Sequence, residues 1–197
     1  PETVWPLQVP QIRFGVDAVD ELAYQLETLG VPGDARGLVV TDGTLAELGH
    51  VGRATDVLEA AGYDADVYTG TEREPSIGTV GACVEFVRDE VGEGGYDYYV
   101  GLGGGSAMDV AKTTRAIVAN GGEVLDYVAA PTGRGETLTE SGAPLVLLPT
   151  TAGTGAEISP VAILAVEEKQ IKEGISSNQV RADAAVLDPA LTTTLPP

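Results

Sequence analysis

The sequence alternates short apolar runs with longer amphipathic segments, and this alternation limits the chain to a small set of folds. Apolar residues at helical spacing predict helices at residues 17–29, 45–61, 77–91 and 107–119. Runs of β-branched and aliphatic residues predict strands at 11–14, 37–41, 65–68 and 98–102. Strands that alternate with helices favour a parallel sheet with helices on both faces, so the expected class is α/β with a Rossmann-like sheet.

The pattern changes after residue 121. A loop rich in Pro, Gly and Thr is predicted at 130–142, followed by strands at 145–148 and 184–187. Between these two strands, residues 158–166 and 170–175 are expected to pair as a hairpin across Glu167-Glu168-Lys169. Residues 1–197 fit one α/β domain, and the terminal Pro196-Pro197 after an apolar strand is interpreted as a boundary or a cut rather than a finished domain edge.

Charge and residue usage exclude several classes of function. Thirty acidic residues against eleven basic ones give a net charge of −19, which disfavours nucleic-acid binding. The sequence contains no apolar run of about 18 residues, as a membrane helix requires, and no export signal, so a cytoplasmic protein is expected. Cys83 and His50 are the only residues of their types, which excludes an intrachain disulfide and a Cys-based or multi-histidine metal site. His50 is expected to be exposed at a helix terminus.

The basic residues comprise eight arginines and only three lysines. A lysine-poor acidic surface suits a cytoplasm of very high salt concentration, where charge repulsion is screened. The sequence therefore favours a halophilic protein, and ordinary solubility is the simpler explanation of the same charge pattern.

The strongest functional signal is a glycine run, Gly103-Gly104-Gly105-Ser106, between the predicted strand at 98–102 and the next helix. Backbone without side chains lets an anion approach, and a helix N-terminus offers free N–H groups, so the run predicts a pyrophosphate cradle. Ser106 is expected to cap the helix and to donate to a phosphate oxygen. The alternative is a glycine-rich turn that only permits a tight connection. Asp109 and Lys112 are most simply a helix ion pair of a few tenths of a kcal/mol.

Asp42 follows the first strongly apolar strand, whereas the glycines come two strands later. The usual dinucleotide fingerprint has the opposite order, but in both cases the residues lie at carboxyl ends of strands, where open α/β sheets bind ligands. Asp42 is predicted to accept hydrogen bonds from an adenosine ribose and to repel a 2′-phosphate, which favours NAD over NADP. Its alternative role is to cap the next helix.

A second signal, Pro149-Thr150-Thr151-Ala152-Gly153-Thr154-Gly155-Ala156-Glu157, follows the predicted strand at 145–148. Hydroxyls and exposed N–H groups at such an edge can bind phosphate or the carboxamide of a nicotinamide ring. The alternative is a polar loop stabilised by Ser/Thr turns.

The two motifs, Gly-Gly-Gly-Ser-x-x-Asp-x-x-Lys and Pro-Thr-Thr-x-Gly-Thr-Gly-x-Glu, resemble those of the iron-containing, or group III, alcohol dehydrogenases. The resemblance runs from Arg13-Phe14-Gly15 to Val186-Leu187-Asp188-Pro189 and so covers nearly the whole chain. Leu125-Asp126-Tyr127-Val128 and Glu74-Pro75-Ser76 are most similar to the hydroxyacid-oxoacid transhydrogenase branch.

The resemblance implies a dehydroquinate-synthase-like N-terminal domain that binds NAD(P), and places the family's helical, metal-binding domain beyond this chain. It implies a position for each cofactor residue. Asp42 would hold the adenosine ribose. The cofactor set that the resemblance implies is Asp42, Gly104, Gly105, Ser106, Asp109, Thr150, Thr151, Thr154, Lys172 and Leu191. Within it the glycines and Ser106 would hold the pyrophosphate, the threonines would line the phosphate and nicotinamide side, Lys172 would reach the nicotinamide ribose, and Leu191 would pack near the adenine. Glu74 stands where many members have Asn.

The resemblance implies the cofactor-binding part of an NAD(P)-dependent dehydrogenase that acts on an alcohol, aldehyde or hydroxyacid. The divalent metal, Fe or Zn, is expected only in the full-length enzyme, because the family's ligands lie past Leu195-Pro196-Pro197 and His50 matches none of them. A homo-oligomer is expected. Two alternatives stay open: a non-catalytic nucleotide-binding or subunit-association module, and a sugar-phosphate or glycerol-phosphate dehydrogenase, for which the chain offers little basic charge.

Overall fold

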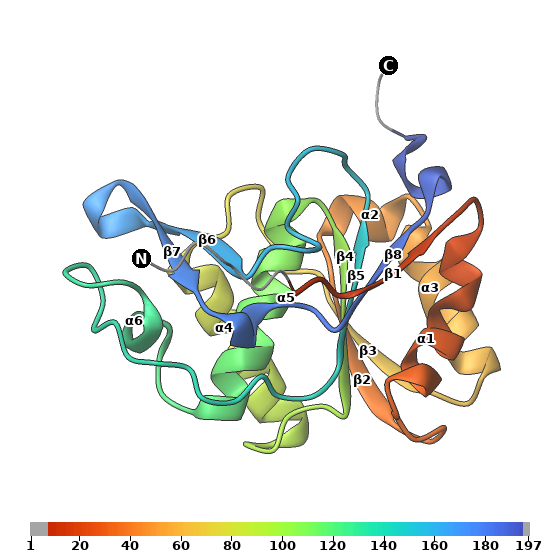
Figure 1. Ribbon diagram of the computed structural model, residues 1–197, viewed down its shortest axis with the longest axis horizontal. Coiled ribbons are helices and arrows are strands. Elements are labelled where there is room, and N and C mark those ends of the chain that lie inside the picture. Colours follow the sequence, from red (N-terminus) through yellow and green to blue (C-terminus); the bar gives the residue numbers. More distant parts are fainter. Residues whose placement is uncertain (1–7, 195–197) are drawn as a thin grey trace.

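A six-stranded sheet forms the centre of the computed structural model, which describes residues 8–194 (Figure 1). Its strands run in the order β1-β8-β5-β4-β2-β3, and every neighbouring pair is parallel. The strands are β1 (Gln11–Phe14), β2 (Arg36–Val40), β3 (Asp64–Tyr68), β4 (Tyr98–Gly103), β5 (Leu145–Pro149) and β8 (Ala184–Leu187). The predicted α/β class and its parallel sheet are therefore confirmed, while the Pro196-Pro197 terminus lies outside the described residues.

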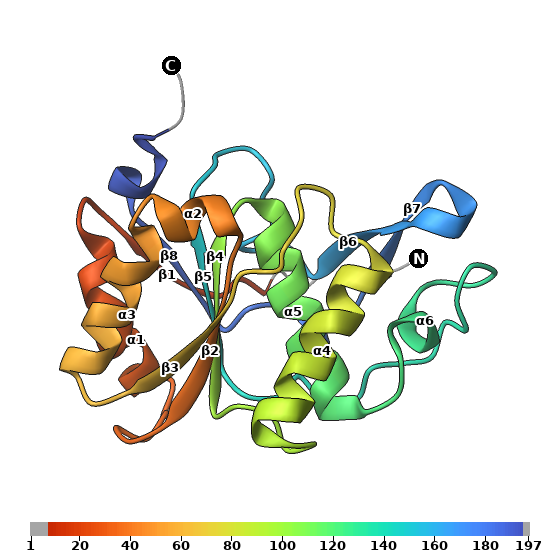
Figure 2. The same cartoon turned by 180° about the vertical axis from the view of Figure 1, so that it is seen from behind.

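Helices cover both faces of this sheet (Figure 2). One face carries α1 (Leu22–Thr28) and α3 (His50–Ala60), and the other carries α4 (Ile77–Val91), α5 (Gly105–Asn120) and the short α6 (Val124–Tyr127). Each face has its own apolar core, because successive strand residues point to opposite sides. In β2, Leu38 and Val40 pack toward α4 and α5, whereas Val39 packs toward α1 and α3.

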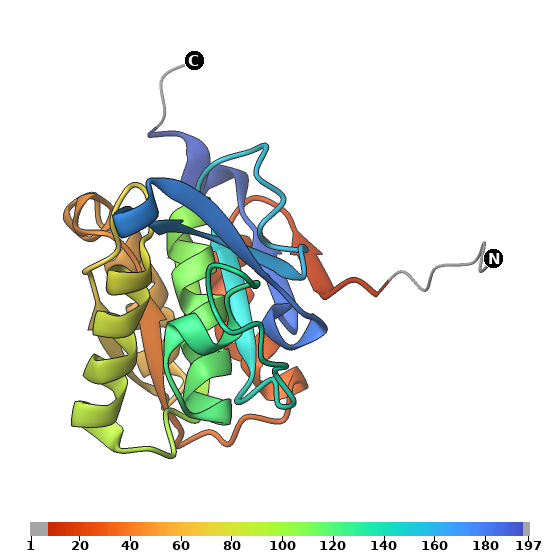
Figure 3. The same cartoon turned by 90° about the vertical axis from the view of Figure 1, so that its left-hand side faces the viewer.

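A separate antiparallel hairpin, β6 (Val161–Val166) and β7 (Ile171–Ser176), lies beyond α4 and α5 (Figure 3). It joins the same core as these helices, because Leu164 and Ile175 are buried there. The predicted hairpin is confirmed, although β6 begins at Val161 rather than at residue 158. The hairpin therefore adds a further layer outside α4 and α5.

The first two predicted helices differ from those observed. The segment predicted at 17–29 begins as a 3-10 turn, Ala18–Glu21, before α1. The segment predicted at 45–61 is broken into α2 (Gly43–Glu47) and α3, because Gly49 has a φ of 84°, a left-handed conformation that interrupts a helix. His50 consequently begins α3, where it is half-buried rather than exposed.

The edge strand β1 carries apolar side chains on the surface. Its register pairs Gln11–Phe14 with residues 184–187 of β8, so the first and last strands of the sheet are neighbours. Ile12 is 50% exposed, Phe14 78% and Val16, just after the strand, 72%. An apolar edge strand is a surface on which other chains can pair.

Two adjacent tyrosines in β4 make the fold sensitive to alkaline pH. Tyr98 and Tyr99 are buried in the two different cores. Burial raises the pKa of Tyr99 to about 12 and also raises that of Tyr98. An unfolded tyrosine ionises near pH 10, so the unfolded chain loses its phenolic protons first and the free energy of unfolding falls as pH rises above about 10.

We expect the loss to approach about 1.4 kcal/mol per pH unit for each such tyrosine between pH 10 and 12. Urea unfolding at pH 9, 10 and 11 measures it. A Tyr99→Phe variant should show a shallower decline over the same interval. An identical slope in that variant would show that Tyr99 does not contribute.

Candidate functional site

A cleft of about 690 Å³ opens at the carboxyl ends of β2, β4 and β5, the edge where open parallel sheets bind ligands. It is walled by α2 and by the loop that follows β3, with the N-terminal turn of α5 on the far side. The side chains and backbone that line it include Asp42, Thr44, Glu47, Thr71, Arg73, Gly104, Ser106, Thr150, Thr151 and Thr194. Residues from both predicted motifs therefore meet in one cavity, together with Asp42.

The glycine run connects β4 to α5, and its first residue has a conformation that only glycine fits. Gly103 has a φ of 153°, and a Cβ atom there would stand 2.7 Å from the Cβ of Ala107. Gly104 is the N-cap of α5 in an extended conformation and provides no capping side chain. The positive end of a 16-residue helix thus faces the cleft across bare backbone, an arrangement suited to an anion.

Ser106 does not cap α5, so this part of its predicted role is wrong. It lies inside the first turn, because α5 begins at Gly105 rather than at Ala107. Its hydroxyl donates a hydrogen bond of 2.7 Å to the backbone oxygen of Arg73. Ser106 therefore ties α5 to the loop after β3, and its donation to a phosphate would require this bond to break.

Asp42 combines the two roles considered for it. One carboxylate oxygen accepts a hydrogen bond of 3.0 Å from the backbone N–H of Leu45, so Asp42 is the N-cap of α2. The residue also lines the cleft. No group within residues 8–194 donates to its second oxygen, which points toward Gly103 and stands 3.9 Å from where a Cβ of that glycine would lie. That oxygen can accept a hydrogen bond from a ligand.

The threonine-rich loop after β5 lies directly against the glycine run. The backbone N–H of Thr150 donates to the oxygen of Gly103 at 2.9 Å. A Cβ at Gly104 would stand 3.6 Å from the hydroxyl of Thr151, and one at Gly105 would stand 3.1 Å from the methyl group of Thr154. Glycine at position 105 allows this close approach of the two motifs, whereas position 104 has room for a Cβ.

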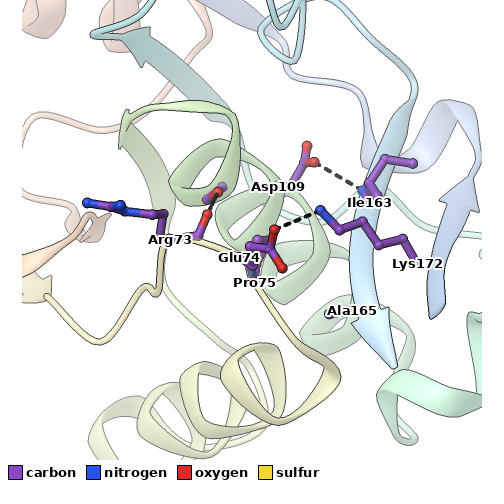
Figure 4. A pocket seen from close by; sticks show the side chains of 8 residues that line it. Arg73, Glu74, Pro75, Asp109, Ile163, Ala165 and Lys172 are labelled. Atoms are coloured by element: carbon purple, nitrogen blue, oxygen red, sulfur yellow. Dashed lines mark hydrogen bonds and ion pairs between the residues drawn. The ribbon is translucent and has the colours of Figure 1, made fainter. Parts of the chain in front are cut away.

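A second, smaller cavity of about 210 Å³ adjoins the cleft, and Arg73 and Ser106 line both (Figure 4). The hairpin β6–β7 forms its opposite wall. Lys172 of β7 lies here rather than in the cleft, and its ammonium is 3.1 Å from the carboxylate of Glu74. Both side chains are more than half exposed, so this ion pair is weak.

Asp109 and Lys112 form a buried network, and their interpretation as a simple helix pair of a few tenths of a kcal/mol is wrong. Lys112 is fully buried, and its ammonium donates to Asp109 Oδ1 at 3.0 Å and to the backbone oxygens of Ala156 and Val161 at 3.1 and 2.6 Å. Asp109 Oδ2 accepts from the N–H of Ile163 at 3.0 Å. Burial lowers the pKa of Lys112, and the neighbouring carboxylate of Asp109 opposes this shift.

Leu191, which the resemblance places near the adenine, is not among the residues that line the cleft. It is 1% exposed and packs in the core beneath α1 and α3, because the turn Pro189–Thr192 points it inward. Sequence analysis also missed Thr71, whose buried hydroxyl has no partner within the described part of the chain, and Arg73, the exposed cation shared by both cavities. The signal that could have found them is their position just after β3, at the same edge of the sheet as Asp42.

Metal-binding side chains do not converge in the described part of the chain. Among residues 8–194, no three His, Cys, Asp or Glu side chains come together as a metal site. None of the helices in the same range has the length and hydropathy needed to cross a bilayer.

Comparisons with known proteins agree on one family. The family model for iron-containing alcohol dehydrogenases matches residues 10–189. Long-chain-alcohol dehydrogenase 1 of Geobacillus thermodenitrificans is 36% identical over 188 residues, which are 95% of this chain and 45% of that protein. The mitochondrial hydroxyacid-oxoacid transhydrogenase of Mus musculus is 34% identical over 191 residues, 96% of this chain and 40% of that protein. The chain thus spans less than half the length of these relatives.

Solved structures share the same fold. Sulfoacetaldehyde reductase from Bifidobacterium kashiwanohense, in complex with NAD+, superposes with a TM-score of 0.85 at 30% identity over 99% of this chain and 49% of that one. An archaeal halo-thermophilic alcohol dehydrogenase from a Red Sea brine pool, bound to NZQ, gives a TM-score of 0.83 at 26% identity over 100% of this chain and 49% of that one.

Proposed function

Because the chain belongs to the iron-containing alcohol dehydrogenase family, we propose that it is the NAD-binding part of an oxidoreductase that acts on an alcohol or its carbonyl counterpart. The observation that carries the proposal is the bare N-terminus of α5 at Gly104, which faces a cleft lined by Asp42 and the threonine loop. The complex of sulfoacetaldehyde reductase with NAD+ supports the same assignment.

The residues present fit a dinucleotide. The cleft is large enough for a nucleotide, and its floor offers backbone N–H groups and the positive end of α5 for a diphosphate. One oxygen of Asp42 and the hydroxyl of Thr71 have no hydrogen-bond partner among residues 8–194. The Asp42 oxygen suits a ribose hydroxyl, and Thr71 offers a further polar contact. The adjoining cavity beside Lys172 is the place for the nicotinamide half.

When bound, the nicotinamide ring supplies the hydride acceptor or donor. The contribution of this chain is to bind and orient: α5 and the glycine run fix the diphosphate, and the hairpin wall limits where the ring can lie. The metal that the family name implies has no ligand cluster among residues 8–194, so we derive no step through it. The substrate class we propose, an alcohol or a hydroxyacid, follows the names of the relatives.

Titration calorimetry with NAD+ and NADP+ tests the cofactor assignment, and Asp42→Asn makes the test specific. Asn keeps an oxygen for the N-cap of α2 but removes the charge, so helix stability should change little. We expect the chain to prefer NAD+ by at least about tenfold, and the variant to lose most of that preference because a 2′-phosphate is no longer repelled. Failure of the unaltered chain to bind either dinucleotide would contradict the proposed function.

We also propose that the protein is halophilic and resides in a cytoplasm of high salt concentration. The net charge of −19 and the scarcity of lysine support this. Exposed carboxylates repel one another. Added salt shortens the range of that repulsion, from about 10 Å at 0.1 M to about 3 Å at 1 M. We expect circular dichroism to show loss of helix on dialysis from molar KCl into dilute buffer, with recovery when salt is restored. Full structure in dilute buffer would contradict the proposal.

A further inference from the structure

The hairpin β6–β7 and the loop that precedes it are joined to α5 by one buried ammonium. Lys112 Nζ has three protons, and each has an acceptor: Asp109 Oδ1 on its own helix, the oxygen of Ala156 in the loop after β5, and the oxygen of Val161 at the start of β6. The carboxylate adds a fourth bond, because Asp109 Oδ2 accepts from the N–H of Ile163. The pair thus binds both ends of the segment 156–163.

From this geometry we infer that Asp109 and Lys112 are positioning residues for the nicotinamide half of the cofactor site, and this inference rests on the proposed function. It assigns to Asp109 a role different from direct contact with the cofactor. Both of its oxygens are already taken by protein donors, and the residue is 8% exposed.

The segment held in this way carries one side of the site. Ile163 and Ala165 of β6 and Lys172 of β7 form the hairpin wall of the smaller cavity. Figure 4 shows the hydrogen bond between Ile163 and the carboxylate of Asp109, two residues that line that cavity. The loop ahead of the segment holds Thr154 against Gly105. A shift of residues 156–163 would therefore move the wall at which the nicotinamide ring is expected.

Other polar bonds of the hairpin lie nearer its surface: Thr132 Oγ1 donates to Glu173 at 3.1 Å, and Lys169 Nζ donates to the oxygen of Thr132 at 3.3 Å. The N–H of Ala165 donates to the oxygen of Pro75 at 2.8 Å, and the exposed Lys172–Glu74 pair spans the cavity mouth. The remaining contact with α4 and α5 is apolar, through Leu164 and Ile175. Apolar contacts are not directional, whereas the four bonds of the buried pair fix both distance and register.

The opposite half of the site has no direct bond to the pair. Asp42, Thr71 and the backbone at Gly104 line the large cleft, and no hydrogen bond joins them to the side chain of Asp109 or Lys112. Loss of the pair should therefore weaken binding of a ligand that reaches the smaller cavity and leave binding of a ligand confined to the cleft unchanged.

The experiment compares NAD+ with ADP, which lacks the nicotinamide riboside, on the chain and on a Lys112→Met variant. Met keeps most of the side-chain length without the ammonium. We expect the dissociation constant for NAD+ to rise at least about tenfold and that for ADP to change less than about twofold. Hydrogen exchange should accelerate over residues 156–166 and stay unchanged in β2 and α2.

Two further variants keep the result interpretable. Lys169→Met, at the exposed turn of the same hairpin, should leave both dissociation constants unchanged. The double variant Asp109→Asn with Lys112→Met removes both charges and so avoids an unpaired buried carboxylate, should Lys112→Met alone fail to fold. It should show the same split between the two ligands.

The outcomes separate the two claims. Equal weakening of NAD+ and ADP in the folded variant, or no weakening of NAD+, would overturn the positioning role while leaving the nucleotide site in place. Failure of the unaltered chain to bind either ligand would instead overturn the proposed function on which the inference rests.

Discussion

Replacing Gly104 by Asp is expected to stabilise the protein slightly and to weaken NAD+ binding by at least about 100-fold, which is about 2.7 kcal/mol. Gly104 is the N-cap of α5, and Asp is among the preferred residues at that position, so the cap should gain a few tenths of a kcal/mol. The fold has room for the new Cβ, whose nearest neighbours would be side-chain atoms of Thr151 at 3.6 and 3.9 Å. The added carboxylate would occupy the place where a diphosphate binds and would repel it.

Because Gly104→Asp is expected to raise stability while it lowers affinity, a general loss of folding could not explain the weaker binding. Thermal unfolding and calorimetry should be run together, at the lowest salt concentration that keeps the protein folded, because salt screens the repulsion. Gly104→Ser is the control: it caps α5 without adding charge and should weaken NAD+ binding far less. An Asp variant that binds NAD+ as tightly as the unaltered chain would show that the diphosphate lies elsewhere.

Replacing Arg115 by Met is expected to lower the free energy of unfolding by about 3–5 kcal/mol. The guanidinium is 1% exposed and donates to Asp183 at 2.8 Å and to the backbone oxygens of Ala143, Gln179 and Arg181. These acceptors lie in the segments that precede β5 and β8, so one side chain connects α5 to the N-terminal ends of both strands. Met fills most of the space but leaves the acceptors without their donor.

The matched control is Arg134→Met. Arg134 also pairs with a carboxylate, Asp126, at 2.6 Å, but its side chain is 72% exposed, so its removal should lower the free energy of unfolding by less than about 1 kcal/mol. Urea unfolding of both variants gives the comparison. Equal losses would contradict the argument that burial and backbone acceptors, rather than the ion pair itself, make Arg115 important.

The parallel sheet could be predicted because its buried strands have a recognisable hydrophobic pattern. Strands covered on both faces consist of continuous apolar residues, as at residues 98–102 and 145–148. The first of these runs is followed by a glycine run and a predicted helix, and the second by a loop rich in Thr and Gly. The break at Gly49 could not be predicted in the same way. The apolar spacing continues on both sides of it, with Leu45 before and Val51 after, so only the backbone conformation of Gly49 reveals the interruption.

Site residues could be predicted where they come just after a strand. They could not be predicted where their position depends on contacts with residues far along the chain. Asp42, the glycines and Thr151 each come directly after a strand, and parallel strands bring those ends together. The burial of Lys112 was missed because the backbone oxygens that accept its protons lie 44 and 49 residues further along the chain. Helical spacing shows only its i,i+3 neighbour, Asp109.

The pairing of β1 with β8 has a consequence for how the chain acquires its structure during translation. Phe14 leaves the ribosome early, but its pairing partner Leu187 emerges only near the end of the described sequence. At bacterial and eukaryotic elongation rates this delay is on the order of tens of seconds. Throughout that interval the nascent β1 has no partner strand, so its backbone N–H and C=O groups stay without their sheet hydrogen bonds until β8 emerges.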